Sequence, residues 1–441
     1  MEKLVIQGGH RLVGSVAASG AKNAALPILI ATLLAPGEHR LANVPDLADI
    51  SSTLSLLGRL GCPSLVGPTL RVDTTRIAFC EAPYDIVSRM RASVLVLGPL
   101  LARHGEAIVS LPGGCAIGTR PIDQHLKGLE ALGCTFELSK GNIHGRTDGL
   151  RGAEINLDMP TVGGTENILM AAVLAEGDSI IRNAAREPEI VDLANFLITL
   201  GANIEGAGTS EIRVSGVPRL SPASRPYRIM PDRIEVGTYL VAGAITRGDV
   251  TVTNCNPDEV RSLLGKLTSA GATIETTDTS IRLIQDGPVQ SFELITEPHP
   301  GFPTDMQSQM CALACFADGV STITENIFEN RFMHAAEMSR MGATIDIVGR
   351  TAIVRGTGAM SSAIVMSSDL RASAALAIAA MGADADMPEG ERGLSELRRL
   401  YHLDRGYENL VDKFRSLGAR LARVEDDESD PAVLLAATQH S

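Results

Sequence analysis

Aromatic residues are scarce in this sequence, which has no Trp, five Tyr and nine Phe among its 441 residues. Ala, Leu, Ile, Val and Gly are plentiful, so the core is expected to pack from small aliphatic side chains. The chain is also too long for one ordinary core. Its length predicts two or three domains.

An excess of positive charge is also missing, because 39 Lys and Arg face 52 Asp and Glu, for a net charge of -13. This balance argues against a nucleic-acid or anionic-membrane surface, so any anion site must be local. The sequence starts without an apolar signal region. Its longest apolar runs, such as 24–35, are about a dozen residues, whereas a membrane span needs roughly 20. We therefore expect a cytoplasmic protein with no membrane insertion and no obligate protein partner.

The seven cysteines contain no CxxC pair, and Cys311 and Cys315 lie four apart in an apolar helical run. This pattern is typical of a reducing compartment and argues against a disulfide framework or a zinc site. His125, His334 and His402 have no metal-ligand spacing, and we interpret them as structural. The sequence also contains no Walker loop, no GxGxxG turn and no Ser-His-Asp signature.

A repeat appears when the glycines are aligned. Small-residue helical runs end at six glycines spaced 68 to 72 residues apart, and a second helix ends at a glycine 23 to 28 residues after each of them. The first set is Gly37, Gly105, Gly177, Gly248, Gly319 and Gly390, and the second is Gly61, Gly133, Gly201, Gly271, Gly342 and Gly418. Two sets in phase indicate six units of about 71 residues.

Each unit has the same expected order of elements. A β-branched strand follows the first helix, an acidic or Asn/Pro turn leads to a second amphipathic helix, and two short strands close the unit. The last unit stops early, and the chain opens with a strand-like stretch at 3–20. We therefore expect the N-terminal strands to complete the sixth unit.

These units predict an α/β protein of two domains with three units each. Residues 22–229 are expected to form a continuous domain that carries Cys115, and residues 1–21 with 230–425 a discontinuous one. Residues 426–441 are expected to form a disordered acidic tail. A cleft between two similar bodies is the usual place for a ligand.

The stretch 110–120, SLPGGCAIGTR, places a thiol beside glycines and a cation. Pro112, Gly113 and Gly114 disfavour helix or strand before Cys115, so the sulfur is expected on an accessible loop. Backbone N–H groups of a glycine turn bind anions, and Arg120 favours the thiolate. The alternative is that Cys115 is a small buried apolar residue, as most lone cysteines are.

Cations recur at matching points of the units. Lys22 and Asn23 begin the first helix, and Arg91 and Arg371 begin helices in RAS triplets that lie 280 residues apart. Helix N-termini attract anions, so cations there predict a phosphate or carboxylate site. Arg120, Arg331 and Arg405 fall in turns after strands. Together these cations favour a substrate with several oxyanions, although any one of them alone is compatible with a solvated surface arginine.

Asp305, in FPTDMQ, is the acid that stands out among these cations. Its position at the start of a helix is compatible with a plain N-cap. In a cation-lined site it is also placed to accept a proton from a substrate hydroxyl. Asp369 and Asp404 each lie near one of the arginines, and we interpret them as residues that orient it.

Eight motifs, which follow one another along residues 1 to about 425, resemble those of one protein family. They are GAKNAALP, YDIVSRMRAS, SLPGGCAIGTRPID, AAREPEIVDLANFL, FPTDMQ, ENRFMH, DLRAS and HLDRGYE. They are similar to the UDP-N-acetylglucosamine 1-carboxyvinyltransferases, which are enolpyruvyl transferases. The resemblance implies a two-domain inverted α/β barrel. It also implies transfer of the enolpyruvyl group of phosphoenolpyruvate to the 3'-hydroxyl of UDP-N-acetylglucosamine, the first committed step of peptidoglycan synthesis, without a metal or other cofactor.

The resemblance also implies roles for individual residues. Cys115 would protonate the methylene carbon of phosphoenolpyruvate, bond covalently to it and be the target of fosfomycin. Asp305 would be the base for the reacting hydroxyl, and Asn23 would hydrogen-bond that hydroxyl. The phosphate would be held by Lys22, Arg120 and Arg405, and the carboxylate by Arg331 and Arg371. The sugar-nucleotide site would include Arg91, Pro121, Ile122, Asp123, Gln124, Thr161, Val162, Gly163, Asp305, Ile327 and Asp369.

The sequence departs from this family in one place. The segment before HLDRGYE, within 381–400, is about eight residues longer than expected and rich in charge. We expect a surface bulge there, which leaves the placement of Arg405 open. Two alternatives remain: transfer of the same group to shikimate 3-phosphate on the same fold, or a catalytically silent paralogue that binds the sugar nucleotide and regulates wall synthesis.

Overall fold

The structure is a computed structural model and describes residues 2–87, 90–111 and 122–425. The described residues divide into two compact units: unit 1 holds residues 2–19 and 231–425, and unit 2 holds residues 20–111 and 122–230. Within the described ranges, the chain passes from one unit to the other after Ser19 and after Met230. Cys115, Arg120, Pro121 and the tail 426–441 lie outside the described residues.

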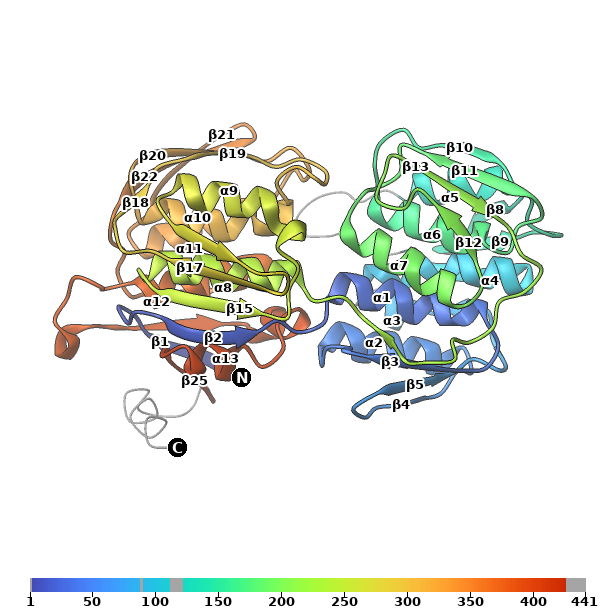
Figure 1. Cartoon of the computed structure of the whole chain (residues 1–441), viewed down its shortest axis with the longest axis horizontal. Helices are drawn as coiled ribbons and strands as arrows, with labels where there is room; N and C mark the ends of the chain where they lie inside the picture. The colour runs from blue at the N-terminus through green and yellow to red at the C-terminus, as the bar shows by residue number, and fades with distance from the viewer. Residues whose placement is uncertain (1, 88–89, 112–121, 426–441) are drawn as a thin grey trace. The chain divides into compact units, whose positions relative to one another are not determined.

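Unit 2 contains three sheets and the helices between their strands (Figure 1). Its strands are β3 (Glu38–Ala42), β4 (Ser64–Leu65), β5 (Leu70–Asp73), β6 (Glu81–Ala82), β7 (Glu106–Ser110), β8 (Thr135–Ser139), β9 (Asn142–Arg146), β10 (Glu154–Asn156), β11 (Asp178–Arg182), β12 (Asn203–Glu205), β13 (Glu211–Ser215) and β14 (Tyr227–Arg228). Its helices, with 3-10 helices written η, are α1 (Lys22–Ala31), η1 (Thr32–Leu34), α2 (Ala48–Arg59), α3 (Tyr84–Val87), η2 (Arg91–Val96), α4 (Leu97–His104), α5 (Asp123–Ala131), α6 (Val162–Ala172) and α7 (Pro188–Thr199).

Unit 1 is built in the same way from three further sheets. Its strands are β1 (Glu2–Gln7), β2 (Val13–Ala17), β15 (Asp249–Thr253), β16 (Thr273–Thr276), β17 (Ser280–Ile284), β18 (Val289–Gln290), β19 (Glu293–Ile295), β20 (Ala317–Thr324), β21 (Thr344–Val348), β22 (Thr351–Thr357), β23 (Ile364–Met366), β24 (Leu394–Arg398) and β25 (Arg420–Glu425). Its helices are α8 (Arg233–Ile245), η3 (Pro257–Val260), α9 (Arg261–Ser269), η4 (Thr304–Met306), α10 (Gln307–Cys315), α11 (His334–Arg340), α12 (Leu370–Gly382), η5 (Glu389–Glu391), η6 (Leu400–Arg405) and α13 (Leu410–Ser416).

One pairing scheme recurs in each of these six sheets. A short strand pairs parallel with the strand that follows a buried helix, and two antiparallel pairings complete the sheet, as in the order β10-β11-β13-β12. Parallel neighbours need a crossover, which the buried helix supplies in every sheet except those of β14 with β3 and β2 with β15, whereas antiparallel neighbours need only a hairpin. Helix and hairpin therefore alternate along the chain.

The first strand completes the last sheet, as predicted. β1 lies between β24 and β25 and pairs antiparallel with both. The prediction is wrong for β2, which pairs parallel with β15 in another sheet of unit 1. The strand that precedes α8 is β14, and it pairs with β3 in unit 2. The position beside β15 is therefore open, and β2 occupies it.

The helices of unit 1 that precede these crossover strands are buried on all sides. All residues of α8 and α10 are buried, as are all residues of α12 from Arg371 onward, and the three helices pack against one another. A helix that is apolar all round requires such an interior position. Alanine-rich sequence, as in LRASAALAIAAMG of α12, lets these helices approach closely. The core of unit 1 is therefore helical, with its sheets outside.

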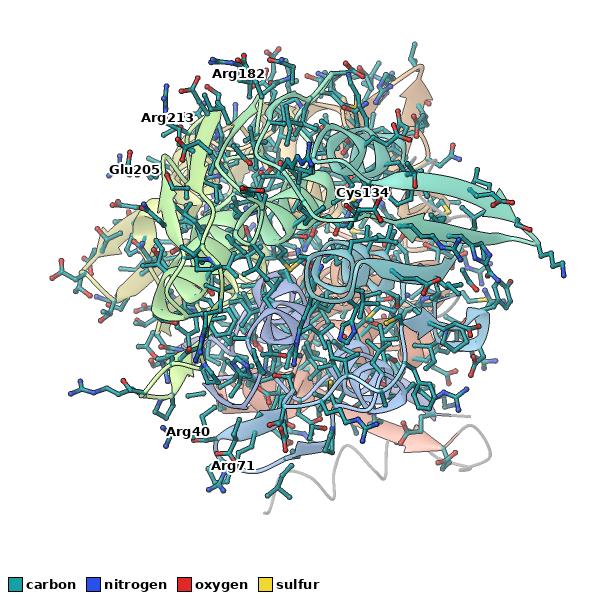
Figure 2. All side chains as sticks on the ribbon, turned by 90° about the vertical axis from the view of Figure 1, so that its right-hand side faces the viewer. Arg40, Arg71, Cys134, Arg182, Glu205 and Arg213 are labelled. Atoms are coloured by element: carbon teal, nitrogen blue, oxygen red, sulfur yellow. The ribbon has the colours of Figure 1, made fainter. Side chains whose placement is uncertain are left out.

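The sheets of unit 2 present charged outer faces. Figure 2 shows Arg182, Arg213 and Glu205 pointing away from the helices of this unit. Glu205 lies opposite Arg213 in the register of β12 and β13, and Arg182 Nε donates a hydrogen bond of 2.6 Å to Glu154. Opposite charges across neighbouring strands stabilise such a face only modestly, because both partners remain hydrated.

The segment before Arg405 forms the predicted surface bulge. Residues 385–391 are exposed, and β24 follows them, paired with β1 and β23. Asp384 holds the base of the bulge, because its carboxylate accepts hydrogen bonds from the backbone N–H groups of Ser362 (3.3 Å) and Gly393 (3.1 Å). The extra residues therefore lie outside β24, and the chain still enters η6 from an ordinary strand.

None of the described helices is both long enough and apolar enough to span a bilayer.

Candidate functional site

Asp305 lies between two arginines in unit 1. The Nη2 atom of Arg331 donates to Oδ1 of Asp305 at 2.7 Å, and the Nη2 atom of Arg371 donates to Oδ2 at 2.8 Å. The side chains of both arginines are only 5 % exposed, whereas that of Asp305 is 26 % exposed. Three segments far apart in the sequence, η4, the turn before α11 and the start of α12, thus meet in one charged cluster.

The arginines determine the charge state of this cluster. Burial alone would raise the pKa of Asp305, but the charges of Arg371 and Arg331 outweigh burial and hold its pKa well below the ordinary value. Burial likewise would lower the pKa of Arg371, but the Asp305 carboxylate raises it. Asp305 is therefore a carboxylate between two guanidinium ions, and the three groups together carry one net positive charge.

Each arginine of the cluster retains a buried donor. The Nη1 atoms of Arg331 and Arg371 have no hydrogen-bond partner among the residues that the structure describes. An aromatic ring lies beside each guanidinium, with Phe328 5.2 Å from Arg331 and Tyr407 5.9 Å from Arg371. Buried donors without partners are costly, so the cluster is suited to bind a further oxyanion.

Glu325 fixes the turn that leads to Arg331. Its Oε1 atom accepts hydrogen bonds from the backbone N–H groups of Ile327 (2.7 Å) and Phe328 (3.1 Å). Its other oxygen accepts from the hydroxyl of Thr304, next to Asp305, at 2.8 Å. This buried carboxylate ties Ile327 and the turn before Arg331 to the segment of Asp305, an arrangement that the sequence did not predict.

The two acids interpreted as orienting groups have different positions. Asp369 is the N-cap of α12, where its carboxylate accepts from the backbone N–H groups of Arg371 (2.9 Å) and Ala372 (3.0 Å). It orients Arg371 through the backbone. Asp404 instead accepts a hydrogen bond from Arg423 on β25, which holds the end of η6 near the sheet.

Arg405 ends η6 and is followed by two residues that pack against α12 and its neighbours. A Cβ at Gly406 would lie 2.6 Å from the side chain of Leu370, so a larger residue there requires Leu370 to move. The Tyr407 hydroxyl lies 2.9 Å from Thr238 Oγ1 and accepts a hydrogen bond of 3.3 Å from Gln309. Tyr407 thus connects the Arg405 turn with Arg371, and α8 and α10 hold it. The motif HLDRGYE in the sequence gives no sign of this role for its tyrosine.

Lys22 and Asn23 begin α1 in unit 2. The Nζ atom of Lys22 lies 3.3 Å from Oδ2 of Asp49, in the first turn of α2, and both side chains are nearly buried. The sequence analysis did not identify Asp49, because nothing local in the sequence marks it as a partner of Lys22. Asn23 is half-buried beside it.

The predicted nucleotide-binding segments of unit 2 come together around α6. Arg91 begins η2, and α6 packs against both η2 and α5. Gln124, in α5, donates to Asp158 at 2.8 Å and accepts from the Asp158 backbone at 2.9 Å, so it supports the loop before Thr161. The described parts of three predicted segments thus converge: Arg91, then Ile122, Asp123 and Gln124, then Thr161, Val162 and Gly163.

Thr161 caps α6, and its Oγ1 atom accepts a hydrogen bond of 3.4 Å from the Gly164 N–H. A Cβ at Gly163 would lie 3.1 Å from the ring of His125, which places α5 close to the start of α6. His125 Nδ1 lies 3.1 Å from Nδ2 of Asn167, so His125 has the structural role expected of it. Among the described residues, no group of three or more His, Cys, Asp or Glu is arranged to hold a metal ion.

The chain is similar to known proteins over almost its whole length. The sequence pattern of the family EPSP synthase (3-phosphoshikimate 1-carboxyvinyltransferase) matches residues 6–414. A UDP-N-acetylglucosamine 1-carboxyvinyltransferase of Geotalea uraniireducens (strain Rf4) is 52% identical over 97% of this chain and 100% of its own length. One of Nitratidesulfovibrio vulgaris (strain Hildenborough) is 54% identical over 96% of this chain and 99% of its own.

Two solved structures share the fold. The enolpyruvyl transferase NikO from Streptomyces tendae superposes with a TM-score of 0.85 at 24% identity and covers 96% of this chain and 99% of its own. An EPSP synthase from Acinetobacter baumannii gives a TM-score of 0.73 at 15% identity, over 96% of this chain and 100% of its own. The predicted α/β fold class is confirmed by this likeness.

Proposed function

The chain belongs to the UDP-N-acetylglucosamine 1-carboxyvinyltransferase family, and from this we propose that it transfers the enolpyruvyl group of phosphoenolpyruvate to the 3'-hydroxyl of UDP-N-acetylglucosamine. Phosphate is the other product, and the reaction is the first committed step of peptidoglycan synthesis in the bacterial cytoplasm. The observation that carries the proposal is the full-length identity to relatives of that name. The cluster of Asp305, Arg331 and Arg371 supports it, because a carboxylate-bearing substrate needs such cations.

In the proposed addition step, Asp305 takes the proton of the 3'-hydroxyl. The electron pair left on the hydroxyl oxygen forms the bond to C2 of the enolpyruvyl group. The C2–C3 π pair then takes a proton from Cys115, and a tetrahedral ketal results. Arg331 and Arg371 would hold the carboxylate, while Lys22, Arg120 and Arg405 would hold the phosphate, and Asn23 the hydroxyl.

In the elimination step, the C2–O bond to the phosphate breaks and its electron pair leaves with the phosphate. The Cys115 thiolate left by the addition takes a proton from C3, and the bonding pair of that proton restores the double bond. The proton on Asp305 goes to the departing phosphate. Cations around the phosphate stabilise the charge of the leaving group, so no metal ion is required in this scheme. The side chains of Arg91, Gln124, Thr161 and Ile327, from segments that we assign to the nucleotide, would fix the acceptor.

Phosphate release by the purified full-length chain tests this function. We expect release from phosphoenolpyruvate only when UDP-N-acetylglucosamine is present, with no loss on addition of EDTA and full inhibition by fosfomycin. Shikimate 3-phosphate in place of the nucleotide should give none. Turnover with shikimate 3-phosphate, or nucleotide binding without any turnover, would contradict the proposal.

The role of Cys115 needs a matched cysteine control. Cys115→Ala should abolish phosphate release, whereas Cys80→Ala should release phosphate at the wild-type rate and remain sensitive to fosfomycin. Cys80 is a suitable control because it is half-buried, and burial raises the pKa of its thiol, which makes it a poor nucleophile. Equal losses in the two variants would remove Cys115 from the mechanism.

A further inference from the structure

Asp305 occupies the hydrogen-bonding groups that the proposed function assigns to the substrate carboxylate. Arg331 and Arg371 each direct one Nη2 atom at a different oxygen of Asp305, at 2.7 and 2.8 Å. A substrate carboxylate would present the same two oxygens at the same spacing. The side chain of Asp305, the proposed base, therefore occupies the position that the substrate carboxylate has to take before the reaction.

The remaining donors show that this arrangement is incomplete for the arginines. Arg331 and Arg371 are buried, and their Nη1 atoms have no partner among the described residues. Two guanidinium ions against one carboxylate leave one positive charge in the cluster, which a second carboxylate would neutralise. Asp305, at 26 % side-chain exposure, is the most accessible of the three.

Asp305 is a poor proton acceptor while both arginines hold it. The guanidinium charges keep its pKa well below the ordinary value although burial opposes them, and a base that weak does not take a proton from a sugar hydroxyl efficiently. The other titratable groups facing the cluster are Asp232, the N-cap of α8, and Tyr407, both beside Arg371. His334 of α11 lies near Arg331, and Asp369, the N-cap of α12, acts on that histidine. The bonds to the arginines have to loosen before Asp305 serves as the base.

We propose that Asp305 is an internal counter-ion that the carboxylate of the enolpyruvyl donor displaces from Arg331 and Arg371, and that this exchange releases Asp305 to accept the acceptor's hydroxyl proton. The inference rests on the proposed function and adds an order of events to it. The donor carboxylate takes over the arginine hydrogen bonds, and Asp305 then faces a neutralised cluster. The proton moves from the hydroxyl to an Asp305 oxygen, and its electron pair stays on the hydroxyl oxygen.

This exchange prevents proton abstraction from the acceptor in the absence of the donor. Before donor binding, the carboxylate of Asp305 is neutralised by two cations. After donor binding, two carboxylates share two guanidinium ions, so that the pKa of Asp305 rises toward its ordinary range or above it. The aromatic rings of Phe328 and Tyr407 keep the guanidinium ions in place during the exchange.

The experiment compares two ligands that differ in one group. The ligand 2-phosphoglycolate carries the phosphate and carboxylate of the donor but no methylene to react, and methyl phosphate lacks the carboxylate. Binding of each to the full chain is measured by calorimetry for wild type, Asp305→Asn and Asp346→Asn. The last variant removes an equal charge from β21 of the same unit, where Asp346 pairs with Arg355.

We expect Asp305→Asn to bind 2-phosphoglycolate about tenfold or more tightly than wild type, because the competitor for the arginines is gone, and methyl phosphate within about twofold. Asp346→Asn should gain nothing for either ligand. Equal gains for both ligands in Asp305→Asn would indicate a general charge effect and overturn the exchange, as would no gain for 2-phosphoglycolate. Binding of neither ligand by wild type would overturn the proposed function with it.

A second measurement uses wild type alone and does not depend on the folding of a variant. Calorimetry in buffers of different ionisation enthalpy counts the protons taken up on binding. If displaced Asp305 becomes a base, 2-phosphoglycolate binding at about pH 4.5 takes up more protons than methyl phosphate binding does, because a carboxyl group of ordinary pKa is partly protonated there. Equal uptake overturns the release of Asp305, while phosphate release in the turnover assay shows separately whether the proposed function holds.

Discussion

The Nζ atom of Lys413 lies 2.6 Å from Oε1 of Glu235, whose side chain is only 2 % exposed. The same lysine donates to the hydroxyl of Ser19, and the backbone N–H of Ser19 donates to the other oxygen of Glu235 at 2.7 Å. Ser19 is the last residue of unit 1 before the chain enters unit 2. One buried ion pair thus holds this exit point against α8 and α13.

Lys413→Met should destabilise the protein by about 3 kcal/mol or more, because it leaves a buried carboxylate without its cation. Burial raises the pKa of Glu235, and the charge of Lys413 opposes that rise. The lysine therefore stabilises the charged carboxylate at this buried position. Urea-induced unfolding gives the measurement. Arg355→Met is the control, because it removes an ion pair whose partners are each 56 % exposed, and should cost under about 1 kcal/mol. Equal costs for the two variants would contradict this account.

Tyr407→Phe should raise the KM for phosphoenolpyruvate by about fivefold with a smaller change in kcat. The phenyl ring still lies against Arg371, but it has lost the hydroxyl that is hydrogen-bonded to Thr238 and Gln309. Because the ring is no longer fixed, Arg371 is held less firmly in the ground state. Steady-state phosphate release measures both constants. Tyr401→Phe, whose side chain is 56 % exposed, is the control. An unchanged KM with a lowered melting temperature would show that Tyr407 acts on stability alone.

Local patterns in the sequence predicted more of the fold than of the site. The alternation of helix and strand follows from residues close in sequence, such as the alanine-rich α12 and the β-branched β15. The partner of β2 does not, because β2 and β14 join sheets whose other strands lie far away in the sequence. Pairing of that kind depends on which strand edge is available, and nothing within either strand records it.

The same limit applies to the cluster of Asp305. The sequence singled out Asp305, Arg331 and Arg371 as charged residues at helix starts and turns, and the structure places them in contact. The sequence could not predict that the arginines bind the acid directly, because they lie 26 and 66 residues away. Neutral supports such as Tyr407 and Gln309 carry no charge pattern. They are identified only from hydrogen bonds in the folded chain.

His334→Leu should reduce the loss of stability on acidification. Burial lowers the pKa of His334 to about 4, with Asp369 opposing and Arg331 adding to the effect. The unfolded chain takes up a proton near pH 6.5 and the folded chain only near 4, so stability falls as pH decreases through that window. Between pH 7 and 5 this residue accounts for about 2 kcal/mol. Urea unfolding at pH 8, 7 and 5 measures it, and wild type and variant should differ in slope only below pH 7. Parallel profiles would mean that His334 has the same pKa in the folded and unfolded chains.

Asp384→Ala should release the surface bulge without affecting turnover. The carboxylate of Asp384 holds the backbone of Ser362 and Gly393, so its loss frees the segment that contains Arg392. Trypsin should cleave after Arg392 several times faster, which is measured by limited proteolysis. Asp386→Ala, in the exposed part of the bulge, is the control and should be cleaved at the wild-type rate.

Phosphate release by Asp384→Ala should stay within about twofold of wild type, because β24 remains paired with β1 and β23 and therefore keeps the chain path to Arg405. A large loss of activity together with faster cleavage would show that the bulge itself positions Arg405. That outcome would connect the extra residues before HLDRGYE with the chemistry. Faster cleavage with activity retained would identify them as a surface addition on an intact strand.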